Sequence, residues 1–139
     1  MARIRISDPE KYLFTCKLTV RVADLNYGNH LANDRILSFA QEARVLFLKS
    51  KGYSELDFFG TSLIQGDAAI SYLSEGFLGD EIQIDLAISD LSQSSFDFVY
   101  AMKNLTTGKK LALAKTRMVC FDYNTRKVTK LPVSFTLLA

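Results

Sequence analysis

One long apolar segment stands among stretches of alternating character, and it limits the folds that this chain can adopt. Residues 32–51 predict a helix, on which Ile36, Ala40, Ala43 and Phe47 recur every three or four positions. Further apolar residues extend this stripe well around the helix. A helix that is apolar on most sides is normally covered by other structure. We therefore expect the helix to lie inside the fold.

The other periodic segments predict β-strands, because apolar and polar residues alternate in them. Residues 15–23 precede the helix, and residues 61–73, 81–90, 95–104 and 110–122 follow it. The order is one strand, one buried helix and a four-strand antiparallel meander. It indicates an α+β fold, with a sheet of about five strands around one central helix.

Two local features refine this sheet. Gly66 lies inside the first strand after the helix, where a glycine suggests a bulge or a close backbone approach. In the last long strand, Ala112, Ala114 and Thr116 form one face of small side chains. Small residues let a helix approach a sheet closely, so we expect this face under the helix.

Length and charge exclude several classes of protein. With 139 residues, 48% of them hydrophobic, the chain fits a single domain over residues 1–139. The 17 Lys and Arg residues are scattered among 15 acids, which disfavours nucleic-acid binding. No run approaches the ~18 apolar residues that cross a bilayer, and the N-terminus lacks a secretory apolar region. We expect a cytoplasmic protein without a membrane partner.

The cysteines and the single histidine also limit the chemistry. Cys16 and Cys120 both lie in predicted strands and are expected to be small buried residues. A zinc site takes about four ligands, and His30 is the only histidine available. We therefore expect no metal and no cofactor, and a chain that stays reduced.

Polar residues gather at one junction, residues 24–33, between the first strand and the helix. The start of a helix presents free backbone N–H groups and the positive end of its dipole, which both favour an oxyanion. We expect amides within residues 28–32 to bind such a group.

This junction resembles the signature of hotdog-fold thioesterases. Those similar to 4-hydroxybenzoyl-CoA thioesterase, and plant acyl-ACP thioesterases, carry Asp-x-Asp and then His-x-x-Asn where residues 22–33 read Val-Ala-Asp-Leu-Asn-Tyr-Gly-Asn-His-Leu-Ala-Asn. Phe39-Ala-Gln-Glu-Ala-Arg44 looks like the family's Phe-Glu-Glu-Ala-Arg, and residues 72–80 resemble its Tyr-x6-Gly-Asp segment. The alanine-rich strand 111–123 is similar to its last strand. The resemblance implies a curved antiparallel sheet wrapped around the helix.

The signature departs from the family at its most reactive position. The second aspartate, which serves the family as nucleophile or base, corresponds to Asn26. An amide cannot accept a proton near neutral pH, although it can hydrogen-bond a thioester oxygen or orient a water. In addition, Gly28 precedes Asn29 rather than His30, so the loop is expected to differ in shape.

Hydrolysis would then need another group to activate water. Asp24, Glu42 and Asp67 are the candidate carboxylates, and burial of Asp67 on an apolar strand would raise its pKa. Each also has a structural interpretation. Asp24 can cap a turn, Glu42 can form an ion pair with a basic neighbour, and Asp67 can accept a backbone hydrogen bond at the bulge beside Gly66. His30 either holds the loop or belongs to the catalytic set, which we take as Asn26, Glu42, Asp67 and His30.

The substrate is expected to lie along the loop and the helix. We predict binding by Tyr27, Gly28, Asn29, Phe39 and Tyr72. The acyl tunnel would be lined by Phe39, Leu46, Tyr72 and Phe77.

The resemblance implies hydrolysis of an acyl-CoA or acyl-carrier-protein thioester. Two other functions stay open: a non-catalytic protein that binds acyl thioesters, and a hotdog dehydratase, for which His30 is the only candidate base. An exposed strand edge and uncovered helix surface predict a homodimer or homotetramer. In the resembled family, the loop of one chain faces the helix and strand of the other.

Overall fold

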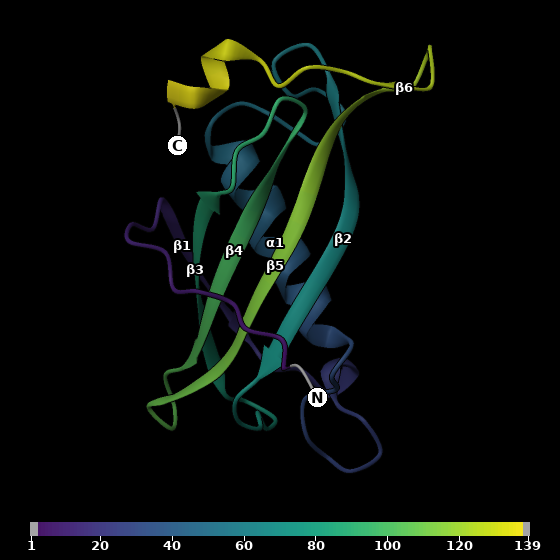
Figure 1. Cartoon of the computed structure of the whole chain (residues 1–139). Helices are drawn as coiled ribbons and strands as arrows, with labels where there is room; N and C mark the ends of the chain where they lie inside the picture. The colour runs from purple at the N-terminus through teal and green to yellow at the C-terminus, as the bar shows by residue number, and fades with distance from the viewer. Residues whose placement is uncertain (1–2, 138–139) are drawn as a thin grey trace.

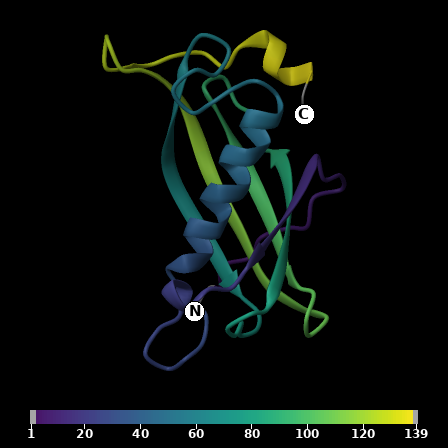
Figure 2. The same ribbon diagram turned by 180° about the vertical axis from the view of Figure 1, so that it is seen from behind.

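The apolar segment forms one long helix, α1 (Arg35–Ser50), which lies against one face of a six-stranded antiparallel sheet (Figures 1 and 2). The computed structural model describes residues 3–137. Its other elements are β1 (Phe14–Thr19), the 3-10 turn η1 (Val22–Asp24), β2 (Ser62–Tyr72), β3 (Glu81–Ser89), β4 (Ser95–Asn104), β5 (Lys109–Asp122), the short β6 (Lys127–Val128) and the 3-10 turn η2 (Val133–Leu137).

The core lies between α1 and the sheet. All four residues of the predicted apolar stripe are buried, with exposed fractions of 3% or less. The small side chains Ala112, Ala114 and Thr116 of β5 are buried as well, and α1 contacts β1, β3 and β5. Small residues on the sheet and an apolar stripe on the helix therefore meet as expected.

The strand order corrects the predicted meander. The order is β1-β3-β4-β5-β2, so β2 pairs with β5 rather than with β3. Residues 73–80 carry the chain from one side of the sheet to the other. This connection is held because the amides of Leu73 and Ser74 donate to the Leu111 carbonyl, and Asn104 donates to the Asp80 carboxylate. As a result, β1 and β2 are the two free edges.

Two boundaries differ from the alternating pattern. The first strand ends at Thr19 instead of residue 23, because the Val20 amide bonds the Asp80 carbonyl and the chain then turns into η1. The helix begins at Arg35 instead of residue 32, because the Ala32 amide bonds back to the Asp24 carbonyl. Both differences lengthen the connection between β1 and α1.

The predicted bulge at Gly66 is confirmed. Gln65 pairs with Met118 and Asp67 with Arg117, so Gly66 is the extra residue in β2. A side chain at Gly66 would place its Cβ 3.1 Å from a methyl carbon of Val119, a tight approach that requires Val119 to shift by a few tenths of an ångström. The bulge inverts the alternation, so Gln65 faces α1 and Asp67 faces the opposite side of the sheet.

The two ends of the described chain pack against different parts of the fold. The N-terminal stretch crosses the face opposite α1 (Figure 1), where Arg5 and Ile6 line cavities together with Leu113 and Lys115. At the other end, the fully buried Phe135 of η2 packs against aromatic rings of the core. No helix within residues 3–137 is long and apolar enough to cross a membrane.

Candidate functional site

The polar junction forms a closed loop at the start of α1, visible below the helix in Figure 2. We call residues 26–33 the 26–33 loop. Leu25 and Leu31 form an isolated antiparallel bridge at its base, and the Asn26 amide donates to the His30 carbonyl at 3.0 Å. The Leu31 amide donates to the Gly76 carbonyl at 2.7 Å, which fixes the loop to the connection between β2 and β3.

Asn26 organises the inside of this loop. Its Oδ1 accepts hydrogen bonds from the Gly28 amide at 2.9 Å and the His30 amide at 3.4 Å. Its backbone carbonyl accepts from the Asn29 amide at 3.0 Å. Asn29 has a φ of 62°, a left-handed conformation that asparagine tolerates better than most residues. The Asn26 side chain therefore shapes the turn of the loop.

The expected row of free amides within residues 28–32 is wrong. The amides of Gly28, Asn29 and His30 all donate to Asn26, and those of Leu31 and Ala32 donate to other carbonyls. The loop folds back on itself before the helix starts, so its own oxygens occupy these donors.

The free donors lie one step further along the chain. Within the described residues, the amides of Asn33 and Asp34 have no acceptor, while the Arg35 amide already bonds the Ala32 carbonyl. Asp34 is the N-cap of α1, and its side chain makes no capping bond. These two amides are at the positive end of the helix dipole, where an oxyanion is stabilised.

Asp24 has a structural role in the η1 turn. Its side chain is 1% exposed and accepts from the Arg21 amide at 2.9 Å and from the Arg21 guanidinium at 3.4 Å. Burial alone would raise the pKa of Asp24, but these hydrogen bonds and the charges of Arg21 and Arg35 outweigh it and lower the pKa. The carboxylate is occupied as a turn cap.

Glu42 and Phe39 share a small cavity between α1 and β1. The cavity has a volume of about 290 Å³ and is lined by both residues with Asp24, Arg21 and Arg35. Glu42 is exposed and Phe39 is buried. The carboxylate of Glu42 is thus accessible to solvent or to a ligand, on the side of α1 nearest β1.

Asp67 does not have the expected environment. It is exposed, and the Gly66 bulge turns it to the side of the sheet opposite α1. Its neighbour across the strand pair is Arg117, which also forms an ion pair with Asp97 at 3.1 Å. The expectation of a buried Asp67 is wrong, and the residue does not meet the 26–33 loop within this chain.

The predicted substrate-binding residues divide between the loop and the free edge strand. Tyr27 at the loop tip is fully exposed, and Gly28 and Asn29 beside it are exposed as well. Tyr72, at the end of β2, donates from its hydroxyl to the Asn33 carbonyl at 3.1 Å. The end of β2 is therefore linked to the start of α1. Phe77 lies in the connection before β3, and Leu46 is partly exposed on α1.

The thiols are poorly suited to nucleophilic catalysis. Both cysteines are free, and burial raises the pKa of Cys120 to about 11. Burial, followed by the charges of Glu42 and Asp85, also raises the pKa of Cys16. A thiol with a raised pKa supplies little thiolate at neutral pH. Within residues 3–137, no group of three or more His, Cys, Asp or Glu side chains gathers as metal ligands.

A buried polar network in the core was missed by the sequence analysis. Arg44 is 5% exposed and donates to Glu55 at 2.7 Å, to the Tyr100 hydroxyl at 3.2 Å and to Gln65 at 3.5 Å. Tyr100 in turn bonds Thr116 at 2.8 Å. The network links α1 to the strand beside the bulge. Arg44 falls in the helix motif, but its partners are distant in sequence.

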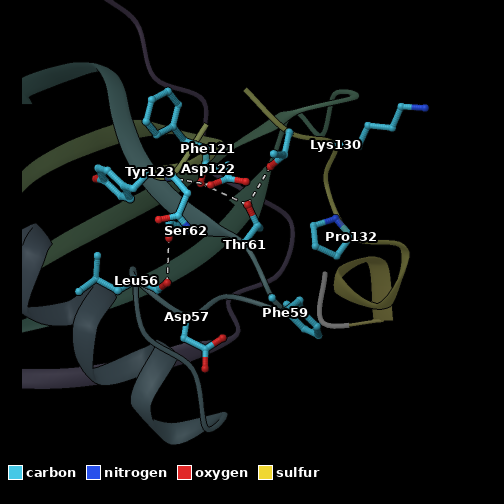
Figure 3. Close-up of a pocket in the computed structure, with 13 residues that line it drawn as sticks. Leu56, Asp57, Phe59, Thr61, Ser62, Phe121, Asp122, Tyr123, Lys130 and Pro132 are labelled. Carbon is cyan, nitrogen blue, oxygen red and sulfur yellow. Dashed lines mark hydrogen bonds between the residues drawn. The ribbon is translucent and has the colours of Figure 1, made fainter. Parts of the chain in front are cut away.

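A larger cavity, shown in Figure 3, lies at the end of the sheet away from the 26–33 loop. Its volume is about 620 Å³, and it opens between the loop before β2 and the end of β5. The Thr61 and Thr129 hydroxyls bond across it at 2.7 Å, and Ser62 donates to the Leu56 carbonyl at 2.8 Å. We call it the β2–β5 cavity; its other lining side chains include Asp57, Phe59, Phe121, Asp122, Tyr123, Lys130 and Pro132.

The amino-acid sequence of this chain is similar to those of known thioesterases. Residues 20–136 match the model of the thioesterase-like superfamily. A 1,4-dihydroxy-2-naphthoyl-CoA hydrolase from Microcystis aeruginosa is 32% identical over 118 residues, which cover 83% of this chain and 84% of that protein.

Solved structures confirm the expected hotdog fold. A 1,4-dihydroxy-2-naphthoyl-CoA thioesterase from Synechocystis superposes with a TM-score of 0.80 at 24% identity, covering 90% of this chain and 93% of that one. A Staphylococcus aureus protein in complex with CoA gives a TM-score of 0.78 at 21% identity, covering 95% and 85% respectively.

Proposed function

The chain belongs to the thioesterase-like superfamily, and we propose that it hydrolyses the thioester bond of an aromatic acyl-CoA. Thioester hydrolysis follows from the family. The 32% identical relative, named as a naphthoyl-CoA hydrolase, is the observation that supports an aromatic acyl group on CoA. Neither this relative nor the solved thioesterase from Synechocystis favours the acyl-carrier-protein alternative, so we set it aside.

We place the reaction at the start of α1. The thioester carbonyl would accept hydrogen bonds from the free amides of Asn33 and Asp34. One such donor typically lowers the barrier by ~3 kcal/mol, because it stabilises the oxyanion of the tetrahedral intermediate. Asn26 shapes the loop beside it, and His30 or Glu42 activates water. Asp67 lies on the wrong face for this role within one chain.

The proposed active form is a homodimer joined through β2. This strand has 11 residues and a free edge, which a second copy can extend by antiparallel pairing. Such pairing brings the Ser62 end of one strand to the Tyr72 end of the other. Because Tyr72 is bonded to Asn33, the β2–β5 cavity of one chain would lie beside the 26–33 loop of the other.

In this arrangement the fully exposed Tyr27 of one chain would be covered by its partner or by the substrate. Two dimers could pair further into a homotetramer. A cytoplasmic location is also part of the proposal, and the two free thiols are compatible with it.

A panel of aromatic and aliphatic acyl-CoAs with detection of the free thiol tests the proposal. We expect kcat/KM for naphthoyl- or benzoyl-type CoA to exceed that for aliphatic acyl-CoAs by at least tenfold. Equal rates for all of them would contradict the aromatic preference. Binding of acyl-CoA without any thiol release would instead identify a non-catalytic binding protein.

A further inference from the structure

His30 is held in one tautomer by the loop. Its Nδ1 lies 3.2 Å from the Leu31 carbonyl oxygen. A carbonyl can only accept a hydrogen bond, so Nδ1 carries the proton that is shared with it. In the neutral ring, the lone pair is then on Nε2.

Asn26 makes only a long, weak contact with that lone pair. Its Nδ2 lies 3.4 Å from Nε2 and 3.5 Å from Nδ1 of His30. The in-plane directions of the two ring nitrogens diverge, so a donor at nearly equal distance from both is aligned with neither. The Nε2 lone pair therefore stays available for a third group.

Gly28 keeps the space beside Nε2 open. A Cβ at this position would lie 3.5 Å from Nε2, 3.4 Å from Cδ2 of His30 and 3.2 Å from Oδ1 of Asn26. A larger side chain there would cover the nitrogen. His30 itself is half-buried, so water can reach it.

The other candidate bases are less well placed. Asp24 is occupied by Arg21, and Asp67 faces the opposite side of the sheet. Glu42 is directed toward β1, two turns along α1 from the free amides of Asn33 and Asp34. Among the residues of the loop itself, only His30 combines a lone pair with a fixed orientation.

We propose that His30 is the general base of this thioesterase, in the role that the resembled family gives to the carboxylate at the position of Asn26. This inference rests on the proposed function. A water molecule attacks the thioester carbonyl carbon and gives one proton to Nε2. The attack produces a tetrahedral intermediate, whose oxyanion accepts hydrogen bonds from the Asn33 and Asp34 amides. The C–S bond then breaks, and Nε2–H returns the proton to the departing sulfur. The products are the free acid and the CoA thiol.

The test compares His30→Asn with the wild-type protein. An asparagine amide can still donate to the Leu31 carbonyl from near the position of Nδ1, but it has no basic nitrogen. We expect kcat to fall by 100-fold or more, the usual range for loss of a general base, while the thermal unfolding midpoint stays within ~2 °C. Lys11→Gln, an exposed residue just before β1 at the edge of the sheet opposite β2, is the matched control and should keep full activity.

His30→Ala adds a second readout, because added imidazole can replace a missing base but not a structural anchor. We expect added imidazole to raise the kcat of His30→Ala at least tenfold. If His30→Asn proves less stable than wild type, this increase decides whether His30 acts as a base. The proposal is overturned if His30→Asn keeps kcat within threefold of wild type, or if imidazole restores nothing. Failure of the proposed function is distinct, since wild-type protein would then release no thiol.

Discussion

At the residue scale, Asn26 stands where the resemblance to hotdog thioesterases implies an aspartate, and an amide there changes how the site can work. Asn26 has a structural role, because its side-chain oxygen accepts two amide hydrogen bonds that shape the 26–33 loop. A carboxylate could accept the same two bonds. The chain therefore keeps the loop geometry without the acid, and the basic nitrogen of His30 becomes the alternative.

Asn26→Asp should hydrolyse aromatic acyl-CoA at least as fast as the wild-type protein. The new carboxylate would supply the acid that the resemblance implies at this position, and either of its oxygens can accept from the Gly28 and His30 amides. Steady-state thiol release measures the effect, with Asn26→Ala as the comparison that removes both functions. A drop of more than tenfold in Asn26→Asp would show that the loop requires an amide.

At the element scale, two short features set the position of the site: the η1 turn and the first residues of α1. Asp24 closes η1 through Arg21, and the Ala32 amide bonds back to the Asp24 carbonyl. The start of the helix is thus attached to the end of the turn. A substitution in η1 should affect the stability of the fold, whereas a substitution at the start of α1 should affect catalysis.

Asp24→Asn should lower the free energy of unfolding at pH 7. The folded-state pKa of Asp24 is below its unfolded value, so the carboxylate stabilises the fold above about pH 4 and loses this contribution as the pH falls further. The difference between variant and wild type should therefore shrink from pH 7 to pH 3. Urea unfolding at pH 7, 5 and 3 measures it, and a difference that stays constant would contradict this origin.

Asp34→Pro tests the oxyanion donors at the helix start. Asp34 has a φ of −69°, which proline can adopt, and proline has no amide hydrogen. We expect kcat to fall by about 10²- to 10³-fold, the cost of one lost donor, while Asp34→Ala keeps the amide and the activity. Circular dichroism monitors the helix in both variants. Equal activity of the two would exclude the Asp34 amide from catalysis.

At the scale of the whole molecule, we propose that the free edge of β2 pairs with a second copy and so completes the site. Ala68 is exposed on this strand beside the bulge. In a two-fold pair of β2 strands, Ala68→Lys would place like charges close together across the new interface, which disfavours pairing. Ala68→Ser is the neutral control. Light scattering should give about twice 15.6 kDa for wild type and Ala68→Ser.

Ala68→Lys should instead approach the monomer mass and lose hydrolysis, because the partner's β2–β5 cavity would be absent. A monomeric wild-type protein with full activity would contradict the shared site.

The buried stripe of α1, the alternation of the strands and the Gly66 bulge were all predictable, because each depends on local periodicity. The face of Asp67 was not predicted, because one inserted residue inverts the pattern that follows it. The occupied loop amides depend on the irregular fold of one short loop, and the pairing of β2 with β5 and the Arg44 network depend on contacts between distant segments. Sequence periodicity contains no information on such contacts.

The most direct test of the site is a crystal structure with a non-hydrolysable aromatic acyl-CoA analogue. We predict its carbonyl oxygen at hydrogen-bond distance from the Asn33 and Asp34 amides, with the acyl carbon facing Nε2 of His30 and the ligand lying between two chains. An analogue bound away from the 26–33 loop, or with its carbonyl directed away from α1, would contradict the account.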